Sequence, residues 1–193
     1  SGIVSLLASS DRPLLSAAIA LAAEWGQVTA VPPLAQFAAN ETDAGLRGEA
    51  LSALRKIGQP AAVDALRALV ATQQPMVVRR DALPPLAVHA PQEALKSLSS
   101  IMGWITNQEA AAVLWRELFQ IKGFAELIAR ELPNDLTVDA YASALKVARG
   151  MGDNGQALVA ALSPMAGTTS AERDFPAEIA SLIADMKNDS DPV

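Results

Sequence analysis

The chain repeats itself every 32 residues, and this repeat constrains its fold more than any other feature. When the sequence is shifted by 32 residues, apolar positions coincide over three consecutive units without a gap. In the first half of the unit the matching sets are Ala18, Ile19, Ala22, Trp25 and Gly26; Ala50, Leu51, Leu54, Ile57 and Gly58; and Ala82, Leu83, Leu86, His89 and Ala90. In the second half they are Val31, Leu34 and Phe37; Val63, Leu66 and Leu69; and Leu95, Leu98 and Ile101. Apolar residues spaced three and four apart share one side of a helix, so each unit is predicted to be two amphipathic helices.

Glycine and proline mark the predicted helix ends. A glycine follows the first helix of three units, where it accepts the left-handed conformation that ends a helix; these are Gly26, Gly58 and Gly152. The Pro32–Pro33 pair falls in the first turn of a second helix, where a missing N–H costs little. The Pro84–Pro85 pair instead interrupts the first helix of the third unit, so we expect that helix to bend or split near Leu83.

Further units extend the array in both directions. A fourth unit starts in register and then drifts, and a fifth begins two residues early. The stretch "IVSLLASS" (3–10) resembles the second helix of a truncated unit, with Ile3 and Leu6 in place of Val63 and Leu66. Stacked helix pairs bury one another's apolar faces. We therefore predict an all-α superhelix of about five two-helix repeats over residues 1–165, its first repeat truncated. Residues 166–187 are expected to form a loop, beginning with "GTTSAER", and a C-terminal capping helix with Ile179, Leu182, Ile183 and Met186 on one stripe; residues 188–193 are expected to be a disordered tail.

The unit "LRGEALSALRKIGQPAAVDALRALV" (46–70) resembles a short bacterial HEAT-like repeat, also found in phycobilin lyases. The resemblance covers about residues 1–165 and implies an α-solenoid. It also implies a non-catalytic scaffold that binds a protein partner, or neighbouring domains of the same chain, along its concave face. HEAT-like enzymes offer the alternative: a bilin lyase or other chromophore-binding module, or a DNA-repair glycosylase-like fold.

Composition and the absence of known motifs argue against several classes of function. The net charge of −6 disfavours nucleic acid, whose phosphate backbone requires a basic surface. The absence of cysteine excludes disulfides, cysteine-ligated zinc and covalent c-type haem on this chain. No motif of a hydrolase, nucleotide-binding or metalloprotease site occurs, so we predict no enzyme activity and no catalytic, cofactor or metal residue. No stretch reaches the ~18 consecutive apolar residues of a membrane span.

Four residues are candidates for an interaction surface. Arg47 and Arg79 occupy equivalent repeat positions, as do Glu49 and Asp81. Two interpretations remain open: a cross-repeat charge ladder, or a short basic strip of Arg47, Arg79 and Arg80 that docks an acidic partner or neighbouring domain. Trp104 lies in the inter-repeat turn "MGWITNQE" and is the candidate for an exposed aromatic contact.

Two other conspicuous residues are interpreted as structural. Trp115 holds a core slot of the fourth unit, and burial explains it without a ligand. His89, the single histidine, has Trp25 and Ile57 as its repeat equivalents and is expected in a core slot near a helix end. A lone histidine without clustered carboxylates or cysteines is a poor metal site.

A second resemblance concerns the context of the chain. The last repeat and the following "PAEIASLIADMKNDSDP" are similar to the repeat region of large planctomycete and verrucomicrobial proteins. In that family a dehydrogenase-like β-propeller precedes the repeats and a c-type haem domain follows them. The resemblance implies that the chain is an excised module without the catalytic or haem-bearing parts, exported or periplasmic in that context. The sequence by itself leaves the partner and the compartment unknown.

Overall fold

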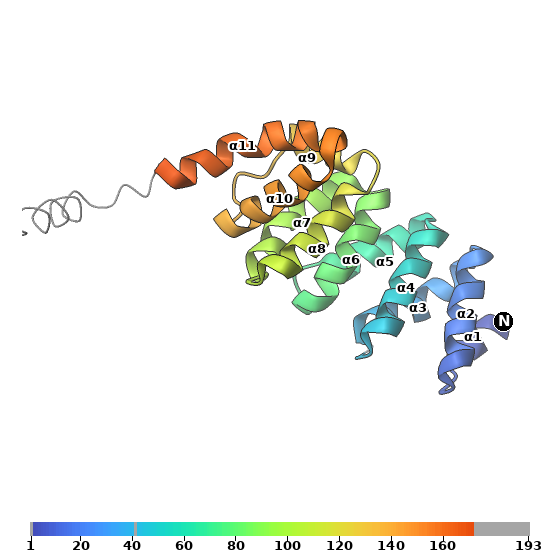
Figure 1. Ribbon diagram of the computed structural model, residues 1–193. Helices are drawn as coiled ribbons and strands as arrows, with labels where there is room; N and C mark the ends of the chain where they lie inside the picture. The colour runs from blue at the N-terminus through green and yellow to red at the C-terminus, as the bar shows by residue number, and fades with distance from the viewer. Residues whose placement is uncertain (1, 41, 172–193) are drawn as a thin grey trace, which may run out of the picture.

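The computed structural model describes residues 2–40 and 42–171, which form eleven α-helices and two short 3-10 helices with no strand. The predicted all-α fold is confirmed (Figure 1). The first helices of the repeats are α2 (Arg12–Glu24), α4 (Ala44–Ile57), α6 (Met76–His89), α8 (Gln108–Phe119) and α10 (Val138–Gly150). The second helices are α1 (Gly2–Leu6), α3 (Val31–Asn40), α5 (Pro60–Val70), α7 (Pro91–Trp104), α9 (Phe124–Arg130) and α11 (Gln156–Ala171). The 3-10 helices are η1 (Val28–Ala30) and η2 (Gly152–Gly155).

The helices form a solenoid of two layers. Each first helix packs on the next first helix along the chain, and from α3 onward each second helix packs on the next second helix (Figure 1). Most apolar positions of the 32-residue repeat point into the core between the layers. Leu34, Leu66 and Leu98, which share one slot, are each 0% exposed. The apolar period of the sequence therefore sets the packing in the first three units.

The helix ends follow the local sequence. Gly26, Gly58 and Gly152 have φ of 58°, 59° and 60°, as predicted for residues that end first helices. At the opposite ends, side-chain oxygens accept hydrogen bonds from backbone N–H groups in the first turns of α2, α4, α8 and α10. The capping residues are Asp11, Asp43, Asn107 and Thr137.

Two expectations about helix ends need correction. The Pro84–Pro85 pair does not split α6, which is helical from Met76 to His89. Leu83 and Leu86 on either side are buried, and their packing offsets the backbone hydrogen bonds that the prolines remove.

The segment 167–171 is not a loop, because α11 continues through Pro164 to Ala171. A single proline removes one helical hydrogen bond, and the alanine-rich sequence before it favours helix. The predicted capping helix and tail lie outside the described residues.

Packing is sparsest at the boundary between the third and fourth units. Contacts between α6 and α8 are fewer than those between any other neighbouring first helices, and α7 and α9 also make few contacts. Two side-chain hydrogen bonds bridge the boundary: Gln92 Nε2 donates to the Glu131 carboxylate (3.2 Å), and Ser99 Oγ donates to Asp135 Oδ1 (2.5 Å). The boundary coincides with the point where the sequence repeat loses its register.

Candidate functional site

Arg47 is built into the repeat stack. Its side chain leaves α4 and its guanidinium donates to the carboxylate of Asp81 on α6, with both Nε and Nη2 at 2.8 Å from Oδ2. Arg80 approaches the other oxygen of the same carboxylate, with Nε at 2.8 Å from Oδ1. Arg47 is 7% exposed. The structure thus forms a cross-repeat charge contact between the second and third units.

Arg79 is also buried, at 5% exposure, but its partners are uncharged. Nε donates to the backbone carbonyl of Val70 (2.9 Å), Nη2 donates to Ser100 Oγ (3.2 Å), and Nη1 lies 2.9 Å from Met76 Sδ. Val70 is the last residue of α5, so the guanidinium satisfies a carbonyl that the helix leaves open and lies at the negative end of the helix dipole.

The proposed docking strip of three arginines is therefore not available as a surface. Arg47 and Arg79 bury their long aliphatic stems between helices and use their guanidinium groups internally. Of the three, Arg80 is the most exposed, and its guanidinium is held by Asp81. Of the two interpretations, the structure favours a contact within the stack for Arg47 and Arg79.

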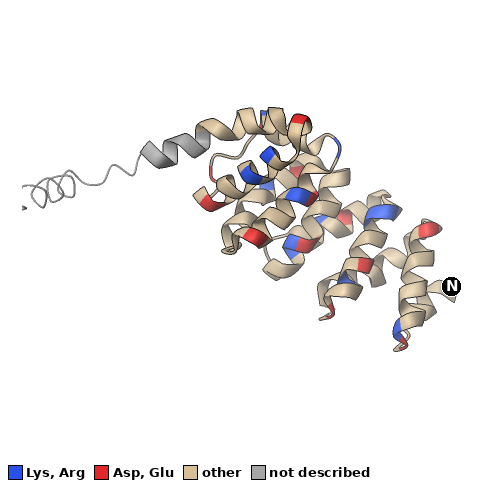
Figure 2. Cartoon of the chain, viewed as in Figure 1, with Lys and Arg blue, Asp and Glu red and all other residues tan. Residues whose placement is uncertain are grey.

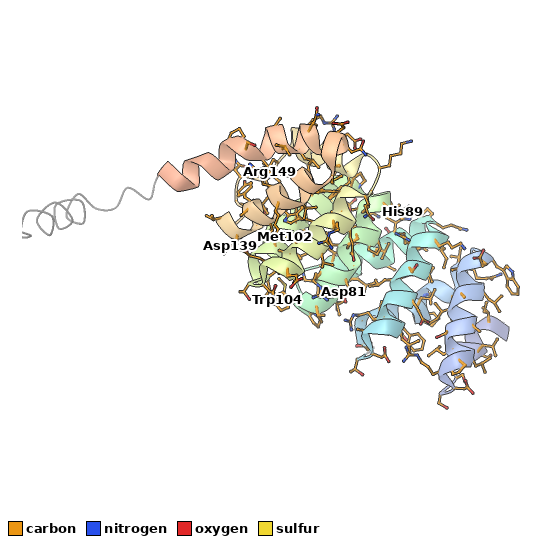
Figure 3. The ribbon with its side chains drawn as sticks, viewed as in Figure 1. Asp81, His89, Met102, Trp104, Asp139 and Arg149 are labelled. Carbon is orange, nitrogen blue, oxygen red and sulfur yellow. The ribbon has the colours of Figure 1, made fainter. Side chains whose placement is uncertain are left out.

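Trp104 and Trp115 have the contrasting environments that the sequence indicated. Trp104 ends α7, next to the turn that leads into α8, and is 50% exposed (Figure 3). Trp115 is 0% exposed, stacks on Phe119 with ring centroids 5.2 Å apart, and donates its Nε1–H to the Ala140 carbonyl (3.0 Å). Trp104 thus remains a candidate contact, whereas Trp115 is part of the core.

His89 and Trp25 do not occupy core slots. Trp25 is 64% exposed as the C-cap of α2, and His89 is exposed at the end of α6. His89 Nε2 lies 2.7 Å from the carbonyl oxygen of Arg55, so the imidazole bonds to the last turn of α4. Its role is structural, as expected, but it acts through a backbone hydrogen bond at the edge of the stack.

A groove between α8 and α10, absent from the sequence predictions, has a volume of about 780 Å³. The walls are formed by Gln108, Glu109, Ala112 and Arg116 from α8, and Ala142, Ser143, Lys146, Val147, Gly150 and Met151 from α10 and its end. The small residues Ala112, Ala142, Ser143 and Gly150 leave the space between the helices unfilled. Arg116 and Lys146 are exposed and border it from opposite sides, while Glu109 borders it near the start of α8.

The cations of this groove differ from those of the preceding units. Most basic residues of the first three units contact an Asp or Glu; these are Arg12, Arg47, Lys56, Arg67 and Arg80. Within the part of the chain that the structure describes, Arg116 and Lys146 form no ion pair. Figure 2 shows basic residues on α8 and α10, and Arg149 adds a third exposed cation in the last turn of α10 (Figure 3). The groove is thus lined by two cations and one acid, Glu109, while its lining residue Gln108 donates to Asp139 (3.4 Å).

Comparison with known proteins supports the fold. A family model for HEAT repeats matches residues 1–87. No curated protein matches the chain. In residues 2–40 and 42–171, no cluster of His, Cys, Asp and Glu could hold a metal ion, and none of the helices combines the length and apolar character that crossing a membrane requires.

Proposed function

We propose that this HEAT-like solenoid is a non-catalytic scaffold that binds a protein partner through the groove between α8 and α10. The match to HEAT repeats and the all-α solenoid support an interaction module. The observation that carries the proposal is the pair of exposed cations, Arg116 and Lys146, which face one groove from two helices and form no ion pair in the described chain.

The charge of the groove indicates the chemistry of the partner. Two cations on opposite walls favour an extended segment that carries Asp or Glu, because one carboxylate can lie between them. The apolar wall residues Val147 and Met151 offer contact area for an adjacent aliphatic side chain. Trp104 ends α7, shortly before the groove residue Gln108 in the sequence, and is the exposed ring that we propose for the rim of the interface.

The direct test is a charge-reversal variant of the whole chain, Arg116→Glu with Lys146→Glu. A fluorescein-labelled peptide of eight glutamates serves as a defined acidic probe, and its fluorescence anisotropy is measured at low and high salt. The wild-type chain should bind the probe, salt should weaken binding, and the double variant should lose it.

The matched control reverses two other exposed basic residues, Arg55→Glu with Lys96→Glu, which changes the net charge equally on α4 and α7. Equal loss of binding in both variants would reduce the effect to overall charge and would contradict a specific groove. Selective loss in the groove variant supports the proposal. Affinity capture from source cells with the same three chains then asks whether one native protein follows the same pattern.

We further propose that the scaffold works within a larger multidomain protein, on the resemblance of its last repeat to the repeat region of haem-bearing dehydrogenase-like proteins. The mass and haem absorbance of the native polypeptide test this. A native species far heavier than 20.1 kDa with covalent haem supports the context. A native species near that mass without haem removes it and leaves the interaction proposal unchanged.

A further inference from the structure

The face of α2 opposite α4 carries an exposed apolar stripe. Leu14 is 41% exposed, Leu21 is 38% exposed and Trp25 is 64% exposed. The spacings of seven and four residues place all three on one side of the helix. Large apolar side chains aligned in this way are unusual on a free surface and mark a contact site.

The repeat register identifies what kind of contact this is. Shifting the stripe by 32 residues gives positions on α4 that are buried: Leu46 at 5%, Ala53 at 2% and Ile57 at 7% exposure. Ala53 lines the space between α2 and α4, so this side of α4 meets the preceding unit. The next shift gives Val78, 3% exposed, and His89, which bonds to the Arg55 carbonyl of α4. The same positions therefore face the preceding unit in the second and third repeats.

Polar contacts between units define the partner further. Asp43, the N-cap of α4, pairs with Arg12 at the start of α2, and Gln59 Nε2 donates to the carbonyl of Gly26 at 3.5 Å. The positions equivalent to Asp43 and Gln59 in the first unit are Asp11 and Gln27. A helix that covers α2 in the same manner would carry a basic residue in its first turn, opposite Asp11, and a left-handed glycine at its end, opposite Gln27.

We infer that the stripe of Leu14, Leu21 and Trp25 is a stacking surface for the first helix of another HEAT-like repeat unit, which packs on α2 as α2 packs on α4. The apolar groove between α1 and α3, about 500 Å³ and lined by Val4, Leu7 and Phe37 among others, lies on the same end of the molecule. This surface is separate from the groove between α8 and α10 and does not depend on the function proposed for it.

The test supplies such a helix. A copy of residues 42–60 is joined directly before Ser1, so that α1 becomes the second helix of a complete unit with Ile3 in the slot of Val63. The background is Trp104→Phe. Because Trp115 is fully buried, acrylamide quenching of tryptophan fluorescence then reports Trp25. The extension should reduce the quenching constant severalfold, shift the emission to shorter wavelength and raise Tm.

The control variants separate stacking from a general effect of the extension. Leu21→Glu in the extended chain should restore quenching of Trp25. Val113→Glu, which changes a similarly exposed apolar residue on α8, should leave the shielding intact. An extension that adds helix by circular dichroism but leaves Trp25 as quenchable as before would overturn the inference. So would a dimer of the unextended chain that Leu21→Glu dissociates, because the occupant would then be a second copy.

Discussion

Arg47 on α4 and Asp81 on α6 form a 2.8 Å ion pair that joins two repeats, and the arginine of this pair is almost completely buried. Asp81 also holds Arg80, so a single carboxylate fixes one guanidinium between the helices and one at the surface. The two arginines differ in burial and share an acceptor, so they allow the energetics of the contact to be dissected.

Removing the shared carboxylate should destabilise the fold more than removing its surface partner. Asp81→Ala leaves Arg47 buried without this acid, and we expect a loss of about 2 kcal/mol in the free energy of unfolding. Arg80→Ala removes a more exposed contact and should cost less than about 1 kcal/mol. Urea unfolding followed by circular dichroism measures both. Equal costs would show that the pair with Arg47 contributes no more than a surface salt bridge.

Arg79 should not tolerate lysine. The guanidinium spans the Val70 carbonyl, Ser100 Oγ and Met76 Sδ, and one ammonium cannot reach all three. We expect Arg79→Lys to lower stability by about 2 kcal/mol, whereas Ser100→Ala should cost about 1 kcal/mol or less. Chemical denaturation gives the comparison. A lysine variant as stable as the wild type would rule out a specific role for the fork-shaped donor.

Gly58 and Gly26 offer a matched pair for alanine substitution, because both have a φ near +58° to +59°. A Cβ at Gly26 would lie 3.8 Å from the nearest side-chain atom, so Gly26→Ala should cost only the left-handed strain of about 1–2 kcal/mol. A Cβ at Gly58 would lie 2.8 Å from His89 Cε1 and would displace the imidazole from the Arg55 carbonyl. We expect Gly58→Ala to cost about 1 kcal/mol more.

Thermal unfolding of the two glycine variants checks this difference, and a double variant locates its origin. In the Gly58→Ala background, His89→Ala should cost much less than it does in the wild type, because the hydrogen bond is already lost. Fully additive effects of the two substitutions would show that the imidazole does not meet the new methyl group.

Stability should fall in acid partly through Asp43. The hydrogen bond from Arg12, followed by those from the backbone N–H groups of Leu46 and Gly45, lowers the pKa of the Asp43 carboxyl. The folded state therefore binds this proton less readily than the unfolded state. The stabilising contribution is complete above the unfolded pKa of about 4 and is lost as pH falls through the lower folded value.

Asp43→Asn isolates this contribution, because asparagine keeps the N-cap hydrogen bond but cannot titrate. We expect the Tm of the variant to fall less than that of the wild type between about pH 5 and pH 2. Glu93→Gln should act in the same direction, since the hydrogen bond from Arg67 lowers the pKa of Glu93. Parallel Tm curves for wild type and variants would remove these carboxylates as sources of acid sensitivity.

The sequence predicted the helices and the core because one repeat pattern records both. Spacing alone identified the buried repeat position of Leu34, Leu66 and Leu98, and the glycines marked the helix ends. Periodicity also predicted core slots for Trp25 and His89, which was wrong. The repeat aligns positions, but the exposure of a position depends on the neighbouring unit that covers it.

The candidate site depended on information that spacing does not contain. Equivalent positions for Arg47 and Arg79 were visible, but the sequence left open whether their guanidinium groups turned inward or outward. The groove between α8 and α10 lies between two closely packed helices, where small side chains leave the space at the surface unfilled. Periodicity indicates which side of each helix faces the core, but it does not show how the side chains outside the core leave a groove between neighbouring helices.

The sparse packing between the third and fourth units determines how the solenoid bends. Each unit contacts only its near neighbours, so the stiffness at any point is that of one boundary. We therefore expect bending to concentrate at the boundary between the third and fourth units, where α6 and α8 make few contacts and two exposed hydrogen bonds run from α7 to the fourth unit. The α2 face and the α8–α10 groove lie on opposite sides of this boundary. The distance between partners bound at the two surfaces can thus change while each surface keeps its shape.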